Sequence, residues 1–345
     1  MLKRLLLLIP ALALILSTAS CGVFWNPTEK YLIALQNMVK ADSMESNAKF
    51  EMHIDLSKAK DDVKSEWEKF EDVTMNIDEA VNREEKKQAH KYFINAGGTP
   101  LDFKVYIDGE NGYFKSAFTG DKYYKLEEME GERNAEETEP KSKEDSEELK
   151  KFFDEIKEIW TDAVKNEIVS REGTSVENTP DGDIKVSNLT LELTDEKGKN
   201  ILSRLAGALS GNSFMKEQAI KGSARYAPKS EKREDVNKAI EDWFKNLPDY
   251  VQESKDKYTL DKLKLTAKVD SDSYIIKQGL SGGLTIKGEG EIKVDFNFEE
   301  TYWNINGKVK VDIPQIKSGD IGDWKDIESD DSDFAEKFKD NFNVK

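Results

Sequence analysis

The chain has 345 residues, of which 69 are Asp or Glu and 52 are Lys or Arg, so its formal net charge is −17. This balance excludes a nucleic-acid-binding protein, because contacts to phosphate need clustered positive charge. A single cysteine and two histidines exclude an intramolecular disulfide and leave little material for a zinc site or a histidine base.

Residues 1–20 have the pattern of an export signal. Lys3 and Arg4 give a basic start, residues 5–16 form an apolar run, and small residues lead up to Cys21. The apolar run is shorter than the ~20 residues that a transmembrane helix needs. We therefore expect a signal peptide over 1–20 and an extracytoplasmic protein.

The stretch TASCG, from Thr18 to Gly22, resembles the lipobox of bacterial lipoproteins. In that family the cysteine becomes the first mature residue and carries a diacylglycerol thioether, usually with a further acyl chain such as palmitate on its amine. The resemblance implies lipidation of Cys21 and a protein anchored on the extracytoplasmic side of the cell membrane, with a tether over 21–27. Two acyl chains hold a protein at a membrane where one is marginal. The family usually has leucine at the position of Thr18, so an ordinary cleaved secretory signal is the alternative.

Residues 28–126 predict a helix followed by an antiparallel meander. The helix is expected to start at Pro27 and Thr28, and apolar side chains recur on one helical face over 31–39. The turn sequence DGENG at 108–112 predicts a hairpin. Alternating apolar and polar residues predict strands over 48–57, 73–77, 101–107 and, as one or two strands, 113–126.

Two acidic segments interrupt these patterns. Residues 127–148 contain eleven acidic residues in twenty-two, which predicts a flexible insert, because such a segment buries too little apolar surface to offset its ordering entropy. Residues 316–345 are predicted to form an acidic tail. Three phenylalanines recur there every four residues, at Phe334, Phe338 and Phe342, which favours a short final helix, with a loose tail as the alternative.

Residues 149–315 predict further helices and a second meander of the same domain. The helices are expected over 149–164, from a cap at Thr194 to 209, and over 236–247, where Pro248 is expected to stop the helix. The strands are expected over 184–193, 263–269, 284–298 and 305–313. Glycines at 282–283 and 288–290 predict bends or bulges in a curved sheet.

This order of elements predicts an α+β fold. We expect a curved antiparallel sheet, an incomplete barrel, that is wrapped around several amphipathic helices or covered by them on one face. The other face is polar and is expected to meet water.

The order also resembles lipoproteins with the LolA/LppX-type fold. The matching pieces are Glu172-Gly-Thr174, Asp181-Gly182, and residues 191–196, 263–270 and 309–314. The resemblance implies an incomplete β-barrel around helices whose concave apolar side holds acyl chains; members carry lipoproteins or lipids across the envelope, and many others have no known role. The chain departs from the soluble carrier LolA in its expected tether and in the insert at 127–148.

The candidate ligand-binding residues are apolar. If the sheet curls, its inner face is expected to be lined by Phe50, Met52, Ile54, Phe103, Val105, Phe296 and Phe298. The alternative is that these side chains simply pack under the helices.

No catalytic residue, metal site or cofactor is expected. His53 and His90 are predicted to face solvent, and two Ser-x-x-Lys matches lack the partner motifs of penicillin-recognising enzymes. A turn beginning at Asp270 starts like a calcium loop but has Tyr274 and Ile275 where that loop needs an oxygen ligand and a glycine.

The sequence therefore favours a monomeric, non-catalytic, membrane-anchored lipoprotein. It is expected to bind a lipid, an acyl chain or a lipidated partner on the concave side of its sheet. The alternative is a structural or interaction lipoprotein that contacts other envelope proteins through its acidic surface, without a ligand cavity.

Overall fold

The computed structural model of the protein describes residues 27–126, 143–165, 170–226, 233–288 and 290–323. Cys21, the predicted signal peptide and tether residues 21–26 lie outside these ranges, as do residues 127–142 of the predicted insert and 324–345 of the predicted tail. Among the helices that the structure describes, none is both long and apolar enough to cross a membrane.

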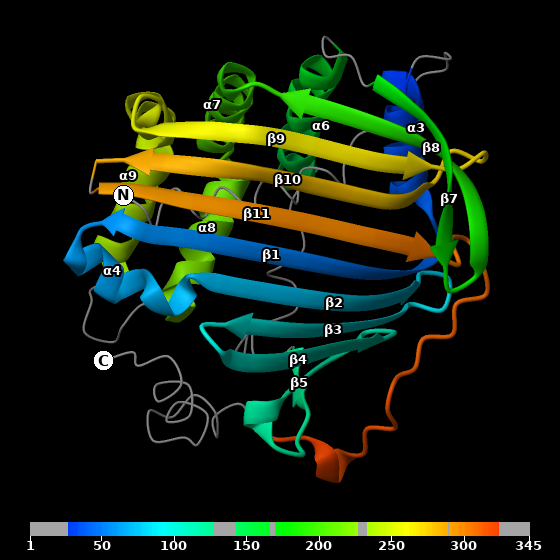
Figure 1. Cartoon of the computed structure of the whole chain (residues 1–345). Helices are drawn as coiled ribbons and strands as arrows, with labels where there is room; N and C mark the ends of the chain where they lie inside the picture. The colour runs from blue at the N-terminus through cyan, green and yellow to red at the C-terminus, as the bar shows by residue number, and fades with distance from the viewer. Residues whose placement is uncertain (1–26, 127–142, 166–169, 227–232, 289, 324–345) are drawn as a thin grey trace.

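The described residues form helices and one open antiparallel sheet of eleven strands (Figure 1). The strand order is β6-β5-β4-β3-β2-β1-β11-β10-β9-β8-β7, so β6 and β7 are edges and the sheet is not closed into a barrel. The strands are β1 (Ser43–Ala59), β2 (Asp72–Asn82), β3 (Lys87–Ala96), β4 (Thr99–Asp108), β5 (Asn111–Ser116), β6 (Tyr124–Lys125), β7 (Ser170–Thr179), β8 (Gly182–Leu193), β9 (Tyr258–Val269), β10 (Ile275–Lys287) and β11 (Gly290–Trp303). The α-helices are α3 (Pro27–Lys40), α4 (Asp61–Trp67), α6 (Lys143–Lys165), α7 (Asp195–Gly211), α8 (Ser213–Tyr226) and α9 (Arg233–Ser254). The predicted combination of helices with a large antiparallel sheet is confirmed.

Strand β1 joins two meanders. It pairs with β2 on one side and with β11 on the other, so that Phe50 lies opposite both Met75 and Phe298. This pairing places the first strand of the described chain, β1, beside the last, β11. The two halves of the sequence therefore share one sheet.

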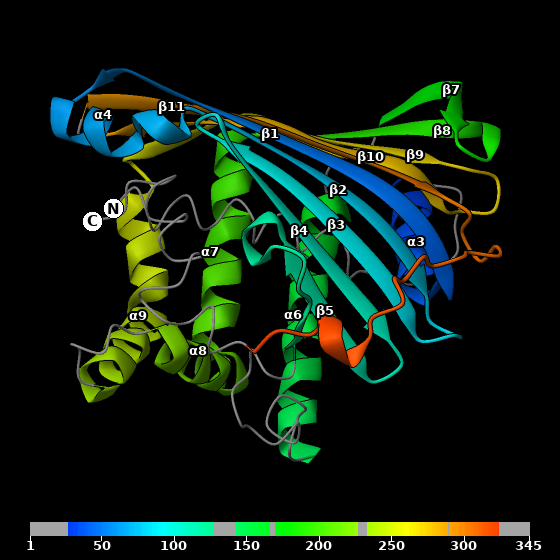
Figure 2. The same cartoon turned by 90° about the horizontal axis from the view of Figure 1, so that it is seen from below.

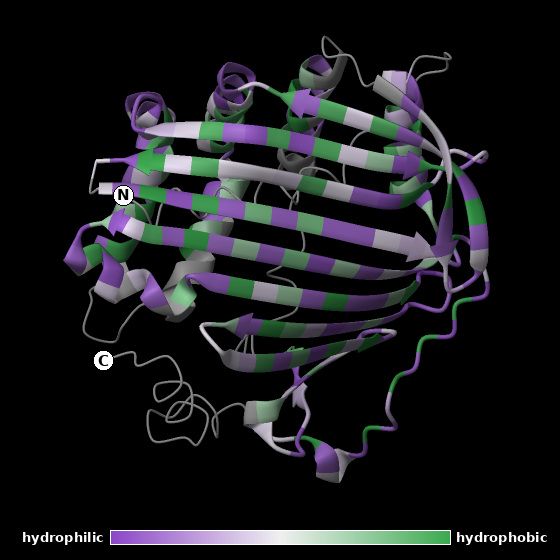
Figure 3. Ribbon diagram, viewed as in Figure 1, coloured by the Kyte–Doolittle hydropathy of each residue, from purple (hydrophilic) through white to green (hydrophobic). Residues whose placement is uncertain are grey.

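Residues that lie opposite each other on neighbouring strands share a face of the sheet. We call the face that carries Ala48, Phe50 and Met52 the inner face. Figure 2 shows that the sheet curves from β1 toward β5 and that α3, α6 and α7 lie on its concave side. Figure 3 shows the alternation of hydrophobic and hydrophilic residues along the strands.

The main core lies on the inner face of β8 to β11. Tyr31 of α3, Trp160 of α6 and Ile201 of α7 form one cluster there with buried strand residues such as Leu191 and Leu265. A second cluster packs Val63 of α4 against β1, β10 and β11. Neither cluster includes a residue of β2 to β5, although Val81 and Leu101 on the inner face of those strands are buried.

One predicted strand is wrong because it spans a turn. The segment 284–298 is the end of β10 and most of β11, joined by a hairpin in which Gly288 and Gly290 have φ of 134° and 92°. This region favours glycine, so these two residues form the turn and not a bulge. A bend or bulge was predicted at Gly282 and Gly283, and the register between β9 and β10 does shift there, between Ser281 and Gly283, with the extra residue on β9.

The predicted strand over 305–313 is also wrong. The preceding strand, β11, is already paired with β1 and β10 on its two sides. Hydrogen bonds to strand ends hold the segment instead, from Asn306 N to Ser43 O at 2.8 Å and from Asn82 Nδ2 to Val309 O at 3.3 Å.

One predicted helix boundary is confirmed and two are wrong. Thr194 caps α7 as expected, because its side chain accepts a hydrogen bond from Lys197 N. Pro248 does not end α9: the helix continues to Ser254, since Leu247 and Val251 are both buried against α7, and this packing outweighs the missing N–H. Helix α6 begins at Lys143 and so takes residues 143–148 from the predicted insert. Strands β3 and β7 and helices α4 and α8 were not predicted.

His53 on the outer face offers a pH test of the register between β1 and β2. It is exposed as predicted, and its Nδ1 lies 2.8 Å from Asp72 Oδ1 on the neighbouring strand. The hydrogen bond to Asp72 raises the pKa of His53, with smaller contributions from the charges of Asp72 and Asp295. Because the folded pKa is raised, the stability that this pair contributes is complete below about pH 6.5 and is lost as pH rises through the folded value.

We expect Asp72→Asn to lower the pKa of His53 toward about 6.5. NMR titration can follow this, because the chain has only two histidines. Asp295→Asn is the matched control and should lower the pKa of His53 less, since Asp295 acts through its charge alone. An unchanged pKa in Asp72→Asn is incompatible with this pairing.

Candidate functional site on the inner face of the sheet

The seven predicted ligand-binding residues share the inner face of the sheet. Phe50 lies opposite Phe298, Met52 opposite Phe296, and Ile54 opposite Val294 on β1 and β11. Phe103 and Val105 on β4 reach the same face through the paired strands β1 to β4.

Their surroundings divide them into two groups. Ile54 is 1% exposed and Phe296 8% exposed, and both are core residues. Phe50, Phe298 and Met52 are partly buried and pack against the core clusters.

Phe103 and Val105 are partly exposed, as Phe50, Met52 and Phe298 are, but they pack against neither core cluster. The Phe103 ring lies 5.9 Å from the ring of Phe114 on β5. Other apolar residues share this face and are also partly exposed: Met75 and Ile77 on β2, and Tyr92 and Ile94 on β3. We call these seven residues of β2 to β5 the apolar face. Of the predicted site, only Phe103 and Val105 belong to it, and neither is part of the two core clusters described above.

Polar side chains cross the inner face next to the apolar face. We call them the polar row, and its members are Gln278 of β10, Glu300 and Tyr302 of β11, Ser46 of β1, Glu79 of β2 and His90 of β3. The strand register makes them neighbours, because Ser46 lies opposite both Tyr302 and Glu79, Glu79 lies opposite His90, and Gln278 lies opposite Glu300.

Hydrogen bonds connect the row at both ends. Gln278 Nε2 donates to Glu300 Oε2 at 3.0 Å, and the Tyr302 hydroxyl donates to the same carboxylate oxygen. At the other end His90 Nδ1 lies 3.1 Å from Glu79 Oε1, and His90 Nε2 lies 3.1 Å from Gln88 Oε1. The His90 and Tyr92 rings are stacked with centroids 6.4 Å apart, which links the polar row to the apolar face.

The electrostatics of the row follow from burial. Desolvation raises the pKa of Glu300. The hydrogen bonds from Tyr302, Gln278 and, more weakly, Ser46 oppose this rise, while the charge of Glu79 adds to it. Burial also raises the pKa of Tyr302, and the neighbouring Glu300 charge raises it further. Burial followed by the Glu79 charge raises the pKa of Tyr92. The row therefore carries two interacting carboxyl groups beside neutral hydroxyl and amide groups.

One buried hydroxyl near the row, Tyr31 Oη of α3, has no hydrogen-bond partner among the described residues, and Tyr31 is 1% exposed. Ser46 is 2% exposed, and its hydroxyl is a weak donor to the Glu300 carboxylate. Ser46 sits between Glu79 and Tyr302 by register, and the Tyr31 hydroxyl acts electrostatically on Tyr302. Buried groups without a partner, such as the Tyr31 hydroxyl, are rare, because an unmade hydrogen bond in the interior costs about 1–3 kcal/mol.

The prediction for His90 is wrong. His90 was expected to face solvent, but its side chain is 17% exposed and lies on the inner face against Glu79. The prediction failed because β3 was not recognised as a strand, so the phase of His90 was unknown. The other members of the row were also missed, although Glu79 continues the apolar phase of Met75 and Ile77.

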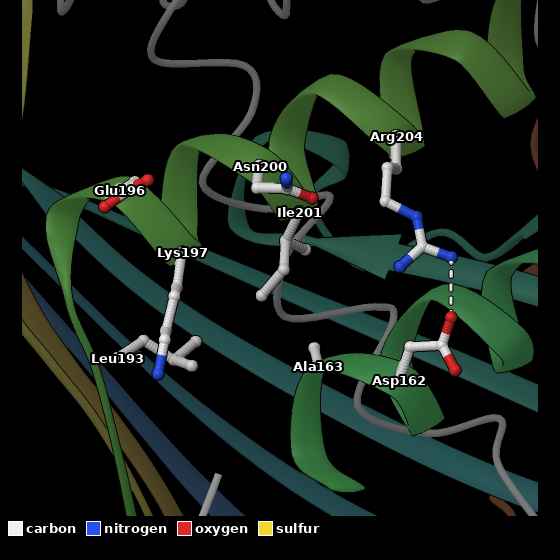
Figure 4. Close-up of a pocket in the computed structure, with 8 residues that line it drawn as sticks. All are labelled: Asp162, Ala163, Leu193, Glu196, Lys197, Asn200, Ile201 and Arg204. Atoms are coloured by element: carbon white, nitrogen blue, oxygen red, sulfur yellow. Dashed lines mark hydrogen bonds and ion pairs between the residues drawn. The ribbon is translucent and has the colours of Figure 1, made fainter. Parts of the chain in front are cut away.

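A separate pocket of about 490 Å³ lies between α6 and the start of α7 (Figure 4). Its lining includes two acidic residues, Asp162 and Glu196, and two basic residues, Lys197 and Arg204. Arg204 Nη2 already pairs with Asp162 Oδ2 at 3.0 Å. The charges are balanced, so the pocket favours neither an anion nor a cation, and we assign it no ligand.

The inner face combines hydrogen-bonding side chains with hydrocarbon surface. Within the described ranges, no group of three or more His, Cys, Asp or Glu side chains is placed to hold a metal ion. The polar row supplies hydrogen-bond acceptors and neutral donors, and the apolar face supplies partly exposed hydrocarbon. Comparison of the sequence with protein-family models finds no match, and comparison with curated proteins finds none either.

Proposed function

We propose that the protein is a membrane-anchored, extracytoplasmic lipoprotein that binds a lipid, an acyl chain or a lipidated partner on the concave side of its sheet. In this proposal Cys21 carries the anchor and the sheet is an incomplete barrel around the helices, as in the LolA/LppX-type fold. The protein acts by binding and not by catalysis.

One observation carries the ligand proposal. The inner face of β8 to β11 is buried under helices. On the inner face of β2 to β5, Val81 and Leu101 are buried as well, but the seven aromatic and aliphatic side chains of the apolar face stay partly exposed on the same curved surface. Monomeric proteins rarely leave contiguous apolar surface open unless it binds something. A hydrocarbon chain is the ligand that such a surface suits, since burial of each CH₂ contributes about 0.8 kcal/mol.

We expect Phe103→Glu to abolish binding of a hydrocarbon chain. The new carboxylate would stand in the middle of the apolar face, where contact with a chain would desolvate it without a partner. Native mass spectrometry of the full chain extracted from membranes in a mild detergent measures this. A non-covalent lipid adduct leaves on collisional activation, whereas a covalent anchor stays.

The matched control is Phe93→Glu. Phe93 belongs to β3, but it is 46% exposed and lies on the outer face, so this variant should keep the adduct. A wild-type protein without any lipid adduct, recovered instead with other envelope proteins after crosslinking, would support the interaction lipoprotein and end the ligand proposal.

A further inference from the structure

The described part of the chain ends at the sheet edge next to the apolar face. After β11 the chain runs as an irregular segment to a short 3-10 helix, Ser318–Asp320, which lies beside β5 in Figures 1 and 2. Tyr123 N then donates a hydrogen bond to Asp320 O at 2.8 Å, and Gly322 N donates one to Tyr123 O at 2.8 Å. Ile321 forms a parallel bridge with Tyr123. Residues 320–322 are therefore held next to the edge strand β6.

Gly322 faces the inner side of the sheet. A Cβ atom at this position would lie 2.6 Å from the ring of Tyr124, so only a glycine fits there. Tyr124 is 6% exposed and lies opposite Phe114, which lies opposite Val105, so its ring is on the same side of the sheet as the apolar face. The described range ends one residue later, at Asp323. Residues 324–345 therefore start at the border of the apolar face.

The sequence that follows has an apolar and a polar side if it is helical. A helix turns about 100° per residue, so phenylalanines spaced by four fall within about 80° of one another. We call them the Phe stripe: Phe334, Phe338 and Phe342. The opposite side of that helix carries polar residues only, namely Glu336, Asp340 and Asn343. A short helix gains most of its stability from packing of its apolar side, so the Phe stripe needs a surface.

The dimensions allow the apolar face to be that surface. Ten residues, 324–333, separate Asp323 from the Phe stripe and reach up to about 35 Å when extended. Strands β2 to β5 are three strand spacings wide, about 15 Å, and a helix over 334–343 is also about 15 Å long. A short linker holds its cargo at an effective concentration on the order of millimolar, which favours this segment over a separate molecule.

We propose that residues 334–343 form a helix whose Phe stripe covers the apolar face, and that a bound hydrocarbon chain displaces this helix. The displacement rests on the proposed function, whereas the docking of the helix does not. Aromatic pairs with side chains such as Tyr92 and Phe103 suit the stripe. The cover shields hydrocarbon from water while no ligand is bound, and it lowers the apparent affinity for a ligand by the fraction of molecules that are open.

Photo-crosslinking tests the docking in the full chain, held in lipid nanodiscs so that no free detergent competes. With Phe338→p-benzoylphenylalanine, ultraviolet light should join position 338 to strands β2 to β5 of the same molecule, which peptide mass spectrometry identifies. Addition of dodecanol should reduce this crosslink. The same photoreactive residue at Asp340 is the matched control, because it points away from the Phe stripe, and it should not crosslink to these strands.

Ligand affinity tests whether the cover competes. Replacing the whole stripe, by Phe334→Ser, Phe338→Ser and Phe342→Ser together, should make dodecanol bind about tenfold more tightly, as expected for a cover that is closed in about nine molecules out of ten. The matched control replaces the opposite side of the helix, by Glu336→Ser, Asp340→Ser and Asn343→Ser together, and should keep the wild-type affinity. Titration followed by native mass spectrometry measures both.

The outcomes separate this inference from the proposed function. If position 338 crosslinks elsewhere, or to a second copy of the chain, or not at all, the cover is refuted, and the proposed function stands as long as dodecanol binds. Equal affinity of the wild type and the stripe variant for dodecanol also overturns the cover. If position 338 crosslinks to β2 to β5 but dodecanol binds neither protein, the docking stands and the proposed ligand site fails.

Discussion

Val294→Asp is expected to leave the chain unfolded at 25 °C. Val294 is 0% exposed in the second core cluster, where it lies opposite Ile54 of β1 and Leu284 of β10. Losing a buried valine costs about 1.5–3 kcal/mol. A carboxylate buried without a cation costs several kcal/mol more, so the sum approaches the ~5–15 kcal/mol by which folded proteins are stable. Circular dichroism with urea titration measures the loss of a cooperative transition.

A milder pair of variants makes this prediction quantitative. Val294→Ala should lower the free energy of unfolding by about 2–3 kcal/mol, because it removes two buried methyl groups and leaves a cavity. Val176→Ala is the control, since Val176 is 63% exposed on the edge strand β7, and should change stability by less than about 0.5 kcal/mol. A Val294→Asp protein with the wild-type urea midpoint would show that β1, β10 and β11 do not pack in this way.

Cys21→Ala is expected to remove all covalent lipid from the protein. Cys21 is the one thiol of the chain, and the proposed anchor depends on its sulfur. Cells grown with an alkyne-labelled fatty acid should label the wild-type protein and should not label the variant. Acyl labelling is the decisive readout, because an uncleaved apolar segment over 5–16 could hold the variant at a membrane without lipid. Where the signal is still cleaved, the variant should leave the membrane fraction.

Thr18→Leu is the matched control for the anchor. It introduces the residue that lipoproteins usually have at this position, so labelling should be kept or increased. Labelling of Cys21→Ala at the wild-type level would place the lipid elsewhere and refute the anchor. Absence of label from the wild-type protein would favour the ordinary secretory signal.

Period-two alternation was enough to predict much of the inner face. Phe50, Phe103 and Phe298 come from strands far apart in the sequence, yet each was assigned to the correct face, since alternation fixes the phase within a strand whatever its partner. The sequence could not decide which of these residues the helices cover. That depends on where α3, α6 and α7 pack, and they pack on β8 to β11.

The polar row could not be predicted, because it exists only through strand register. Glu79 follows Ile77 in phase, and Glu300 and Tyr302 follow Phe298 in phase, so each strand places polar groups on its apolar side. This was a signal in the sequence, but it does not show that these residues are neighbours. The unrecognised strand β3 hid His90, and the missed turn at Gly288 merged β10 with β11, which hid the pairing of Gln278 with Glu300.

A crystal structure of the protein grown with 12-bromododecanol tests the central proposal most directly, because bromine is located by its anomalous scattering. The proposal predicts a bromine peak on the inner face of β2 to β5, in contact with side chains of the apolar face such as Phe103, Ile77 or Phe114. A structure in which residues of the chain itself fill that face, with no bromine signal there, would contradict it.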